Sequence, residues 1–315
     1  MRFDWREAIN LPLISIITPS YNRAGMIETA IKSVLDQDYR QFEHIIIDGG
    51  STDGTLDVIK KYSHLRVVIE PDQGMYDALN KGLSLATGEI IGFLNTDDFY
   101  APCIFTQIAL KFSEGTVDAV AGLAGIAQHS ADVAHEKVLY RPGQGEYLIR
   151  HTVLEPPIFN AYFFSRSVFN KIDGFDTRYK IAADRDFMLR FALSNFNTVI
   201  VDFPVYYYLQ HSGSMTIGYT EAKFRKIVDE HLLLSKSYIE TRSKFPRLLI
   251  KSLVEMRTRD TIRVCAHCLR QKEFSGAWFY LKEGFRYNPL WLIRFLKHAI
   301  VHPIRQKKGL PYKSP

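Results

Sequence analysis

The sequence has little cysteine and no long apolar run, and each of these absences argues against one class of protein. Its three cysteines, Cys103, Cys265 and Cys268, are too few for a disulfide framework. We therefore expect reduced thiols in a cytoplasmic setting. No uninterrupted apolar stretch reaches the roughly 18 residues of a membrane-spanning helix. Because Asp4 and Glu7 stand where a secretory signal would be basic, we expect a soluble, unexported chain.

Glycine and proline are too few for a collagenous or low-complexity chain, since the 315 residues hold 19 and 13 of them. Hydrophobic residues make up 46% and charged residues 23%, which are ordinary globular values. This length allows one large domain with an appendage or two modest domains.

The net charge of +6 is distributed unevenly along the chain. From Glu240 to Pro315 there are 17 Lys and Arg against 5 Asp and Glu, or +12, whereas the rest of the chain holds 23 against 29, or −6. Such a basic segment suggests an anionic partner, either nucleic acid or a membrane surface. A solvated helical face would have the same composition.

Short β-branched runs alternate with helical patterns from Leu13 onward, which predicts an α/β fold. We expect strands at 13–18, 44–48, 66–70, 89–95, 117–123, 160–166 and 198–203, and helices at 26–35, from about 51, at 75–86, up to about 112 and at 184–193. Residues 141–147 are typical of a loop. From Tyr219 the pattern is helical, which places a domain boundary near residue 216.

Polar residues follow several of these strands, among them Asp48 and the segment Asn95–Asp98. In open α/β sheets ligands bind beyond the carboxyl ends of the strands, so these residues should share one crevice. The adjacent carboxylates Asp97 and Asp98 offer hard oxygen ligands for Mg²⁺ or Mn²⁺, which would in turn hold a diphosphate. A helix cap would explain the same pair without a metal.

Five motifs, in one order, resemble those of family 2 glycosyltransferases of the bacterial surface-polysaccharide type. They are TPSYNR (18–23), IIIDGGSTDGT (45–55), DQGMYDALNKG (72–82), TGEIIGFLNTDD (87–98) and GFDTRYKIAADRDFMLR (174–190). The resemblance covers residues 13 to about 215. It implies a GT-A fold, which is a Rossmann-like mixed sheet flanked by helices, together with a nucleotide-diphosphate sugar donor, Mg²⁺ or Mn²⁺, and inversion at the anomeric carbon.

On this resemblance, residues 1–215 form the GT-A catalytic domain and residues 216–315 a helical, basic C-terminal region. The nucleotide-sugar half of the catalytic domain is expected at about 13–100 and the acceptor half at about 101–215.

The resemblance also implies which residues bind the donor. They are Pro19, Tyr21, Asp48, Asp72, Asn80, Lys81 and Asp97. Pro19 and Tyr21 would form the wall of the nucleotide pocket, and Asp48 would accept hydrogen bonds from the base and ribose. Lys81 would offset phosphate charge, although a solvated surface lysine is equally consistent with the sequence. Many relatives carry a second Asp where this chain has Gly49, so one secondary contact is in doubt.

Asp184 matches the catalytic base of the family's Glu-Asp motif, with Ala183 in place of the usual Glu. An inverting transfer needs a carboxylate that takes the proton of the acceptor hydroxyl as it attacks. Asp186 is the nearby competitor, but two residues further along a helix it should face elsewhere. A helix cap is the alternative role for Asp184.

The metal ligands implied by the resemblance are Asp97, Asp98 and His211. The family often has Asp where this chain has Asn95, which leaves open which carboxylate touches the metal. His211 falls where some relatives place a basic residue near the donor phosphate. It would ligate the metal or stabilise the departing diphosphate, unless it is an ordinary surface histidine.

The C-terminal region interleaves aromatic and apolar residues with basic ones. The apolar set is Phe274, Trp278, Phe279, Leu281, Phe285, Tyr287, Leu290, Trp291, Phe295 and Leu296. Aromatics beside cations suit the headgroup layer of an anionic bilayer, so we expect peripheral attachment to the cytoplasmic face of the inner membrane. RNA binding would use similar residues, but no recognition-module signature is present, and we expect no nucleic-acid partner.

Together these features predict a metal-dependent inverting glycosyltransferase that moves a sugar from a nucleotide-diphosphate sugar to a hydroxyl of a glycan or lipid-linked acceptor, in surface-polysaccharide biosynthesis. A sugar-nucleotide nucleotidyltransferase is the first alternative, but TPSYNRAG is not the Gly-rich basic phosphate loop that it would need. A non-catalytic nucleotide-sugar binding protein is the second. The presence of Asp97, Asp98 and Asp184 argues against it.

Overall fold

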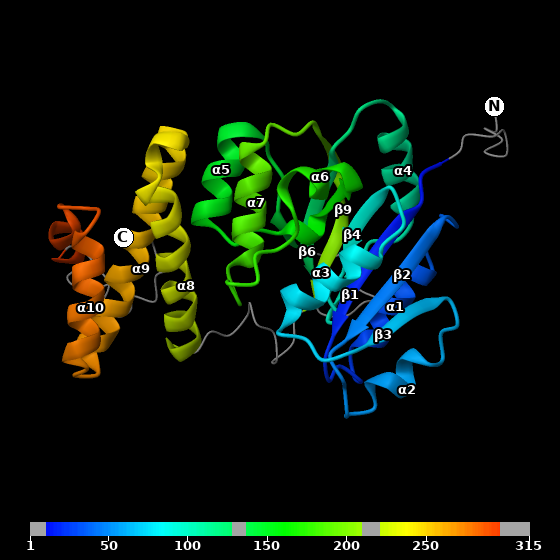
Figure 1. Cartoon of the computed structure of the whole chain (residues 1–315), viewed down its shortest axis with the longest axis horizontal. Helices are drawn as coiled ribbons and strands as arrows, with labels where there is room; N and C mark the ends of the chain where they lie inside the picture. Colours follow the sequence, from blue (N-terminus) through cyan, green and yellow to red (C-terminus); the bar gives the residue numbers. More distant parts are fainter. Residues whose placement is uncertain (1–10, 128–136, 210–220, 297–315) are drawn as a thin grey trace. The chain divides into compact units, whose positions relative to one another are not determined.

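The computed structural model describes residues 11–127, 137–209 and 221–296 (Figure 1). The chain divides into two compact units, one of Met1–Leu148 with Pro157–Gly218 and one of Ile149–Pro156 with Tyr219–Pro315. The first unit contains the sheet and the second is helical, as the α/β prediction with a helical extension requires. The assignment of 1–215 to catalysis and of 216–315 to a separate role stays a prediction.

The described part of the first unit is built on a mixed nine-stranded sheet in the order β3-β2-β1-β4-β8-β6-β9-β5, with β7 paired to β6. The strands are β1 (Ile14–Ser20), β2 (Phe42–Asp48), β3 (Leu65–Ile69), β4 (Ile90–Phe93), β5 (Asp98–Tyr100), β6 (Ala119–Ala127), β7 (Lys137–Tyr140), β8 (Tyr162–Ser165) and β9 (Thr198–Leu209). Strands β1 to β4 run parallel, and β8 is antiparallel to both β4 and β6.

Amphipathic helices connect these strands. They are α1 (Ile27–Leu35), α2 (Thr55–Ile59), α3 (Met75–Leu85), α4 (Phe105–Ser113), α5 (Gly145–Leu154), α6 (Arg166–Ile172) and α7 (Ala183–Leu193), with a short 3-10 turn η2 at Phe159–Ala161. Helix α1 buries Ile27, Ala30, Ile31 and Val34, at the spacing of one helical face. Helix α3 packs so closely on β1 that a Cβ at Gly82 would lie 2.3 Å from Cγ2 of Ile17.

Parallel pairing brings the carboxyl ends of the first three strands to one edge. Ser20 of β1 pairs with Asp48 of β2, and Asp48 pairs with Ile69 of β3. The loops that follow these strands therefore begin side by side, as the sequence predicted.

Most predicted elements are present, but three elements were not predicted and one local prediction is wrong. Strands β5 and β7 and helix α6 were not predicted, and helix α5 begins at Gly145, inside the predicted loop at 141–147. A three-residue strand such as β5 is too short to give a periodic pattern. Its pairing with β9 stabilises it instead, and that partner lies more than 100 residues away in the sequence.

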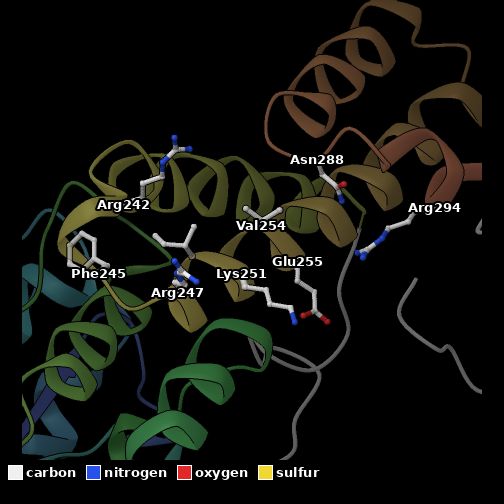
Figure 2. Close-up of a pocket in the computed structure, with 9 residues that line it drawn as sticks. Arg242, Phe245, Arg247, Lys251, Val254, Glu255, Asn288 and Arg294 are labelled. Carbon is white, nitrogen blue, oxygen red and sulfur yellow. The ribbon is translucent and has the colours of Figure 1, made fainter.

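The second unit is formed by helices α8 (Glu221–Glu240), α9 (Arg247–Arg270) and α10 (Phe274–Phe285), with a 3-10 turn η3 at Arg242–Lys244. Its core contains Val228, Leu232, Ile262, Val264, Cys265, Cys268, Ala277, Tyr280 and Trp291. Both cysteines are buried free thiols. None of the helices in the described ranges is long and apolar enough to cross a membrane. A cavity lined by basic residues also lies in this unit (Figure 2).

Candidate active site

Asp48 lies at the carboxyl end of β2 and organises the loop that follows it. Its Oδ1 accepts hydrogen bonds from the backbone N–H groups of Gly50 (3.0 Å) and Ser51 (2.7 Å). Its Oδ2 accepts from the hydroxyl of Ser51 (2.7 Å), which itself accepts from the backbone N–H of Asn22 (2.8 Å). The buried carboxylate therefore fixes the loops after β1 and β2 against each other.

Tyr21, Gly49 and Asp72 meet beside this loop. A Cβ on Gly49 would lie 2.6 Å from Oδ2 of Asp72 and 3.3 Å from Cδ2 of Tyr21. Oδ1 of Asp72 accepts from the backbone N–H of Gly74 (2.8 Å), just before α3. The Asp72 carboxylate thus occupies the space that a second Asp at position 49 would need. The ring of Tyr21 is 58% exposed beside it.

Three further residues predicted to bind the donor, Pro19, Asn80 and Lys81, have structural roles of their own. Pro19 is buried inside β1. The amide of Asn80 donates to the carbonyl of Phe175 (2.7 Å) and accepts from its backbone N–H (2.8 Å), so it braces the segment before α7. Nζ of Lys81 donates to the carbonyl of Pro71 (2.7 Å). Their contacts with a donor stay predictions.

The ion pairs of Lys81 bear on its predicted role. Its Nζ lies 3.1 Å from Oε1 of Glu70 and 3.4 Å from Oδ2 of Asp77. Partial burial opposes the charged form, but the hydrogen bond to Glu70 and the charge of Asp77 outweigh it and raise the pKa of Lys81. Two carboxylates therefore already offset the charge that was expected to face phosphate.

Asp98 lies in β5 and is buried. Its Oδ2 accepts from the hydroxyl of Tyr206 (2.5 Å) and from Nδ2 of Asn95 (3.2 Å), and its Oδ1 accepts from the backbone N–H of Leu209 (3.2 Å). Burial, followed by the charge of the neighbouring Asp97, raises the pKa of Asp98 to about 8. The helix-cap alternative is wrong for this pair because the next helix, α4, begins only at Phe105.

The surroundings of Asn95 and Asp97 fit a hard cation. The buried Oδ1 of Asn95 has no hydrogen-bond partner, and Asp97 is partly exposed. A divalent cation would satisfy this oxygen and relieve the repulsion between the two carboxylates. Within the described ranges no three His, Cys, Asp or Glu side chains form a metal-binding group, so phosphate oxygens would have to complete the coordination. His211 lies outside the described residues.

Asp184 is partly exposed in the first turn of α7. Burial raises its pKa to about 6, against the opposing effects of the Arg185 charge and of hydrogen bonds from Arg185 and Tyr76. The backbone N–H of Arg185 donates to Oδ1 of Asp184 (2.6 Å). Asp184 is not the helix cap, since the N-cap residue of α7 is Ala182 and no side chain caps it.

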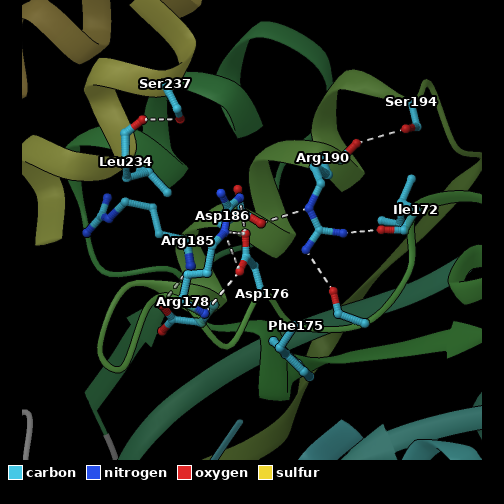
Figure 3. Close-up of polar contacts among 12 residues, drawn as sticks. Ile172, Phe175, Asp176, Arg178, Arg185, Asp186, Arg190, Ser194, Leu234 and Ser237 are labelled. Carbon is cyan, nitrogen blue, oxygen red and sulfur yellow. Dashed lines mark hydrogen bonds and ion pairs between the residues drawn. The ribbon is translucent and has the colours of Figure 1, made fainter. Parts of the chain in front are cut away.

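Asp186 forms an ion pair with Arg190, four residues further along α7 (Figure 3). Its Oδ2 lies 2.8 Å from Nε of Arg190, and the carboxylate is almost fully buried. Arg190 also donates to the carbonyls of Ile172 and Gly174, which ties α7 to the preceding loop. Asp186 therefore serves an ion pair that holds α7 in place.

Tyr208 of β9 pairs with Asp98 across the sheet, and the charges of Asp98, Asp184 and Asp97 all act on it. Burial raises its pKa well above the usual value, and the charges of Asp98, Asp184 and Asp97 raise it further, in that order. Sequence reasoning missed both Tyr206 and Tyr208 because the strand predicted at 198–203 in fact continues to Leu209. The run of three tyrosines at 206–208 is a β-favouring signal that would have extended it.

Comparison with known proteins assigns a family to this arrangement. Residues 15–172 match the model of the family described as glycosyl transferase family 2. The chain is 33% identical over 186 residues to a PGL/p-HBAD biosynthesis glycosyltransferase of Mycobacterium bovis, with 57% of this chain and 69% of that relative covered. It is 27% identical over 237 residues to the uncharacterized glycosyltransferase EpsJ of Bacillus subtilis, with 70% and 67% covered.

Solved structures share the fold. TarS 1-349 of S. aureus, in complex with UDP-GlcNAc, superposes with a TM-score of 0.56 at 18% identity, covering 96% of this chain and 93% of that one. Against the longer TarS chain, 43% of that chain is covered. The mannosyltransferase PcManGT of Pyrobaculum calidifontis, in complex with GDP-Man and Mn²⁺, gives 0.55 at 17% identity, covering 93% and 88%. At these identities the likeness concerns the fold alone.

Proposed function

The chain belongs to glycosyl transferase family 2, and from this premise we propose that it is an inverting, metal-assisted enzyme with Asp184 as the general base. The fold is GT-A and the activity is glycosyl transfer. A nucleotide-diphosphate sugar is the donor, as in the complexes of TarS and PcManGT. We further propose that the acceptor is a hydroxyl of a glycan or lipid-linked molecule in surface-polysaccharide biosynthesis, in line with the name of the mycobacterial relative.

The observation that carries the mechanism is the difference between the environments of Asp184 and Asp186. Asp184 is partly exposed, and its pKa is raised to about 6. A base with a pKa just below neutral is ionised at pH 7 and still accepts a proton effectively. Asp186 is held by Arg190. Of these two carboxylates, only Asp184 suits deprotonation of an acceptor hydroxyl.

The neighbours of Asp184 would hold it in position for this step. The N–H of Arg185 and the hydroxyl of Tyr76 both donate to its carboxylate. The single O–H of Tyr76 is also within donating distance of the carbonyl of Ile181 (3.1 Å), in the segment that leads into α7, so the two acceptors would share it. These hydrogen bonds would fix the orientation of the Asp184 carboxylate, including the lone pairs that they leave unused.

On the donor side, the exposed ring of Tyr21 and the carboxylate of Asp72 support base and ribose recognition. An aromatic ring offers a stacking face to a nucleobase, and a carboxylate accepts from a base N–H or a ribose hydroxyl. Asp48 uses its oxygens to shape the adjoining loop, so its contribution to the pocket would be partly through that loop. Pro19 would form part of the wall of the nucleotide pocket.

For the cation, we propose Mg²⁺ or Mn²⁺ at Asp97 and the amide oxygen of Asn95, with Asp98 buried behind them and the donor phosphates as the other ligands. Bound there, the cation would neutralise negative charge on the nucleoside diphosphate leaving group. The buried, unpartnered Oδ1 of Asn95 supports this position. The hydrogen bonds from Tyr206 and Leu209 to Asp98 would keep that carboxyl fixed. A role for His211 stays a prediction.

The exposed aromatic residues of α10 support attachment to an anionic membrane surface, on the cytoplasmic face. Phe274, Trp278 and Phe279 are 70%, 58% and 50% exposed, and Lys282 lies 5.0 Å from the ring of Trp278. Part of the predicted apolar set has a packing role instead, since Trp291 is buried in the helical core and Leu281 and Phe295 pack against it. The exposed part would enter the headgroup layer.

Release of nucleoside diphosphate tests the proposal. The protein is incubated with a panel of nucleotide-diphosphate sugars, with and without Mg²⁺ or Mn²⁺, and thermal stabilisation is followed in parallel. We expect one donor both to stabilise the protein and to release nucleoside diphosphate in the presence of the cation. A nucleotidyltransferase would instead release pyrophosphate from a nucleoside triphosphate and a sugar phosphate. A binding protein would be stabilised without any release.

A further inference from the structure

The helical unit contains a cavity of about 560 Å³ that no part of the proposed reaction uses (Figure 2). Four basic side chains line it. Arg242 comes from η3, Arg247 and Lys251 from the start of α9, and Arg294 from the segment after α10. Arg294 extends toward the face of α9 that carries Lys251 (Figure 2). Segments up to about 50 residues apart thus bring positive charge to one place.

These four cations have no carboxylate partner among the residues that the structure describes. The acidic residue in the lining, Glu255, lies 3.7 Å from the guanidinium of Arg150, which offsets its charge. Three other arginines of this unit each lie beside a carboxylate, in the pairs Arg225–Glu273, Arg257–Glu283 and Arg286–Glu240. Four basic side chains that lack a carboxylate partner in the described ranges therefore line one cavity.

The backbone adds to the positive electrostatic potential at the cavity. Helix α9 has 24 residues and begins at Arg247, and no side chain caps its first N–H groups. The positive end of the helix therefore lies beside the cationic side chains. Ile250 and Val254 lie on the same helical face as Lys251, and with Phe245 they give the cavity an apolar wall next to the basic one.

We propose that this cavity binds the phosphate group of an amphiphile, with the cations on the phosphate oxygens and the apolar wall on the first methylenes of its chain. Guanidinium groups match phosphate oxygens in pairs, and the volume is that of a small-ligand site. An anionic phospholipid headgroup and the phosphate of a lipid-linked acceptor present the same chemistry. Only the second source rests on the proposed function.

Isothermal titration of the full chain with dihexanoyl phosphatidic acid and with inorganic phosphate tests the site. The variant Arg247→Gln/Lys251→Gln removes two cavity charges. The control Lys236→Gln/Arg270→Gln removes two exposed charges outside the cavity lining. We expect the cavity variant to weaken phosphatidic acid binding about ten-fold or more, as for the loss of two charge-assisted contacts, and the control to change it little. Inorganic phosphate should bind more weakly than the amphiphile.

Equal loss in both variants, or equal binding of inorganic phosphate, would overturn the proposal. Vesicle sedimentation then separates the two sources. If binding to phosphatidylglycerol vesicles depends on Arg247 and Lys251, the ligand is a bilayer headgroup. If dependence is confined to neutral vesicles that contain a long-chain isoprenoid phosphate, the ligand is a carrier lipid. If binding to neither kind of vesicle depends on Arg247 and Lys251, the proposed phosphate site is wrong. Donor hydrolysis is followed in all variants, so a failure of the proposed reaction is seen separately.

Discussion

Replacing Asp184 by Asn should remove the proposed catalytic base without disturbing the fold. Asp184 is partly exposed, and the substitution would alter its interactions with the adjacent Arg185 and with the hydroxyl of Tyr76. An amide of the same shape cannot take the acceptor proton. We therefore expect kcat to fall roughly 10²-fold or more, with donor binding close to that of the wild type.

The dependence of kcat on pH in the wild-type protein gives a second quantitative test of Asp184 as the base. With a pKa of about 6, Asp184 is mostly ionised at pH 7 and mostly protonated at pH 5. Because the base acts in its deprotonated form, kcat should fall roughly ten-fold for each pH unit well below 6 and level off above 7. An aspartate with the ordinary pKa of about 3.9 would stay mostly ionised at pH 5 and give a flat profile there.

Asp186→Asn is the matched control, since it makes the same chemical change two residues away. It leaves Arg190 without its buried carboxylate partner, so we expect a loss of roughly 1–3 kcal/mol in the free energy of unfolding. Transfer is measured as nucleoside diphosphate release, and folding by thermal denaturation. If Asp186→Asn reduces kcat more than Asp184→Asn in folded protein, or if the wild-type profile is flat down to pH 5, the assignment of the base is wrong.

Three further predictions concern the metal, the donor pocket and the membrane. Excess chelator should abolish nucleoside diphosphate release reversibly, and Asp97→Asn should raise the cation concentration needed for half-maximal release; full activity in chelator would refute this. Gly49→Asp should weaken donor binding in calorimetry roughly ten-fold, because its Cβ would lie 2.6 Å from Oδ2 of Asp72, and unchanged affinity would show that Asp72 moves freely. Phe274→Ser/Trp278→Ser should reduce sedimentation with anionic vesicles, whereas high salt should release the wild type and neutral vesicles should bind little. Unchanged vesicle binding by this variant would return α10 to a packing role.

The parallel half of the sheet could be predicted from the sequence because its signals are local. The β-branched runs that form β1, β2 and β4 each lead into polar residues, and the helical period of α1 and α3 is strong. Motif order then led to the family, which the match over residues 15–172 confirms. The same motifs named the acidic residues whose charges act on Tyr208.

Partners far away in the sequence could not be predicted in this way. The burial of Asp98 results from the pairing of β5 with β9 and from the hydroxyl of Tyr206, 108 positions away. The amide of Asn80 was assigned to the donor from its motif, but its visible partner is the backbone of Phe175, 95 positions away. A motif indicates which residue types are present at a site, but it does not show which atoms form hydrogen bonds with them.

The anomeric configuration of the first sugar released tests the central claim most directly. Slow hydrolysis of the donor identified in the screen, followed by proton NMR before mutarotation, reports the face from which water attacks. We predict that the first free sugar has the configuration opposite to that of the donor, and that Asp184→Asn slows its appearance. A first product with the donor's own configuration would contradict an inverting transfer with Asp184 as the base.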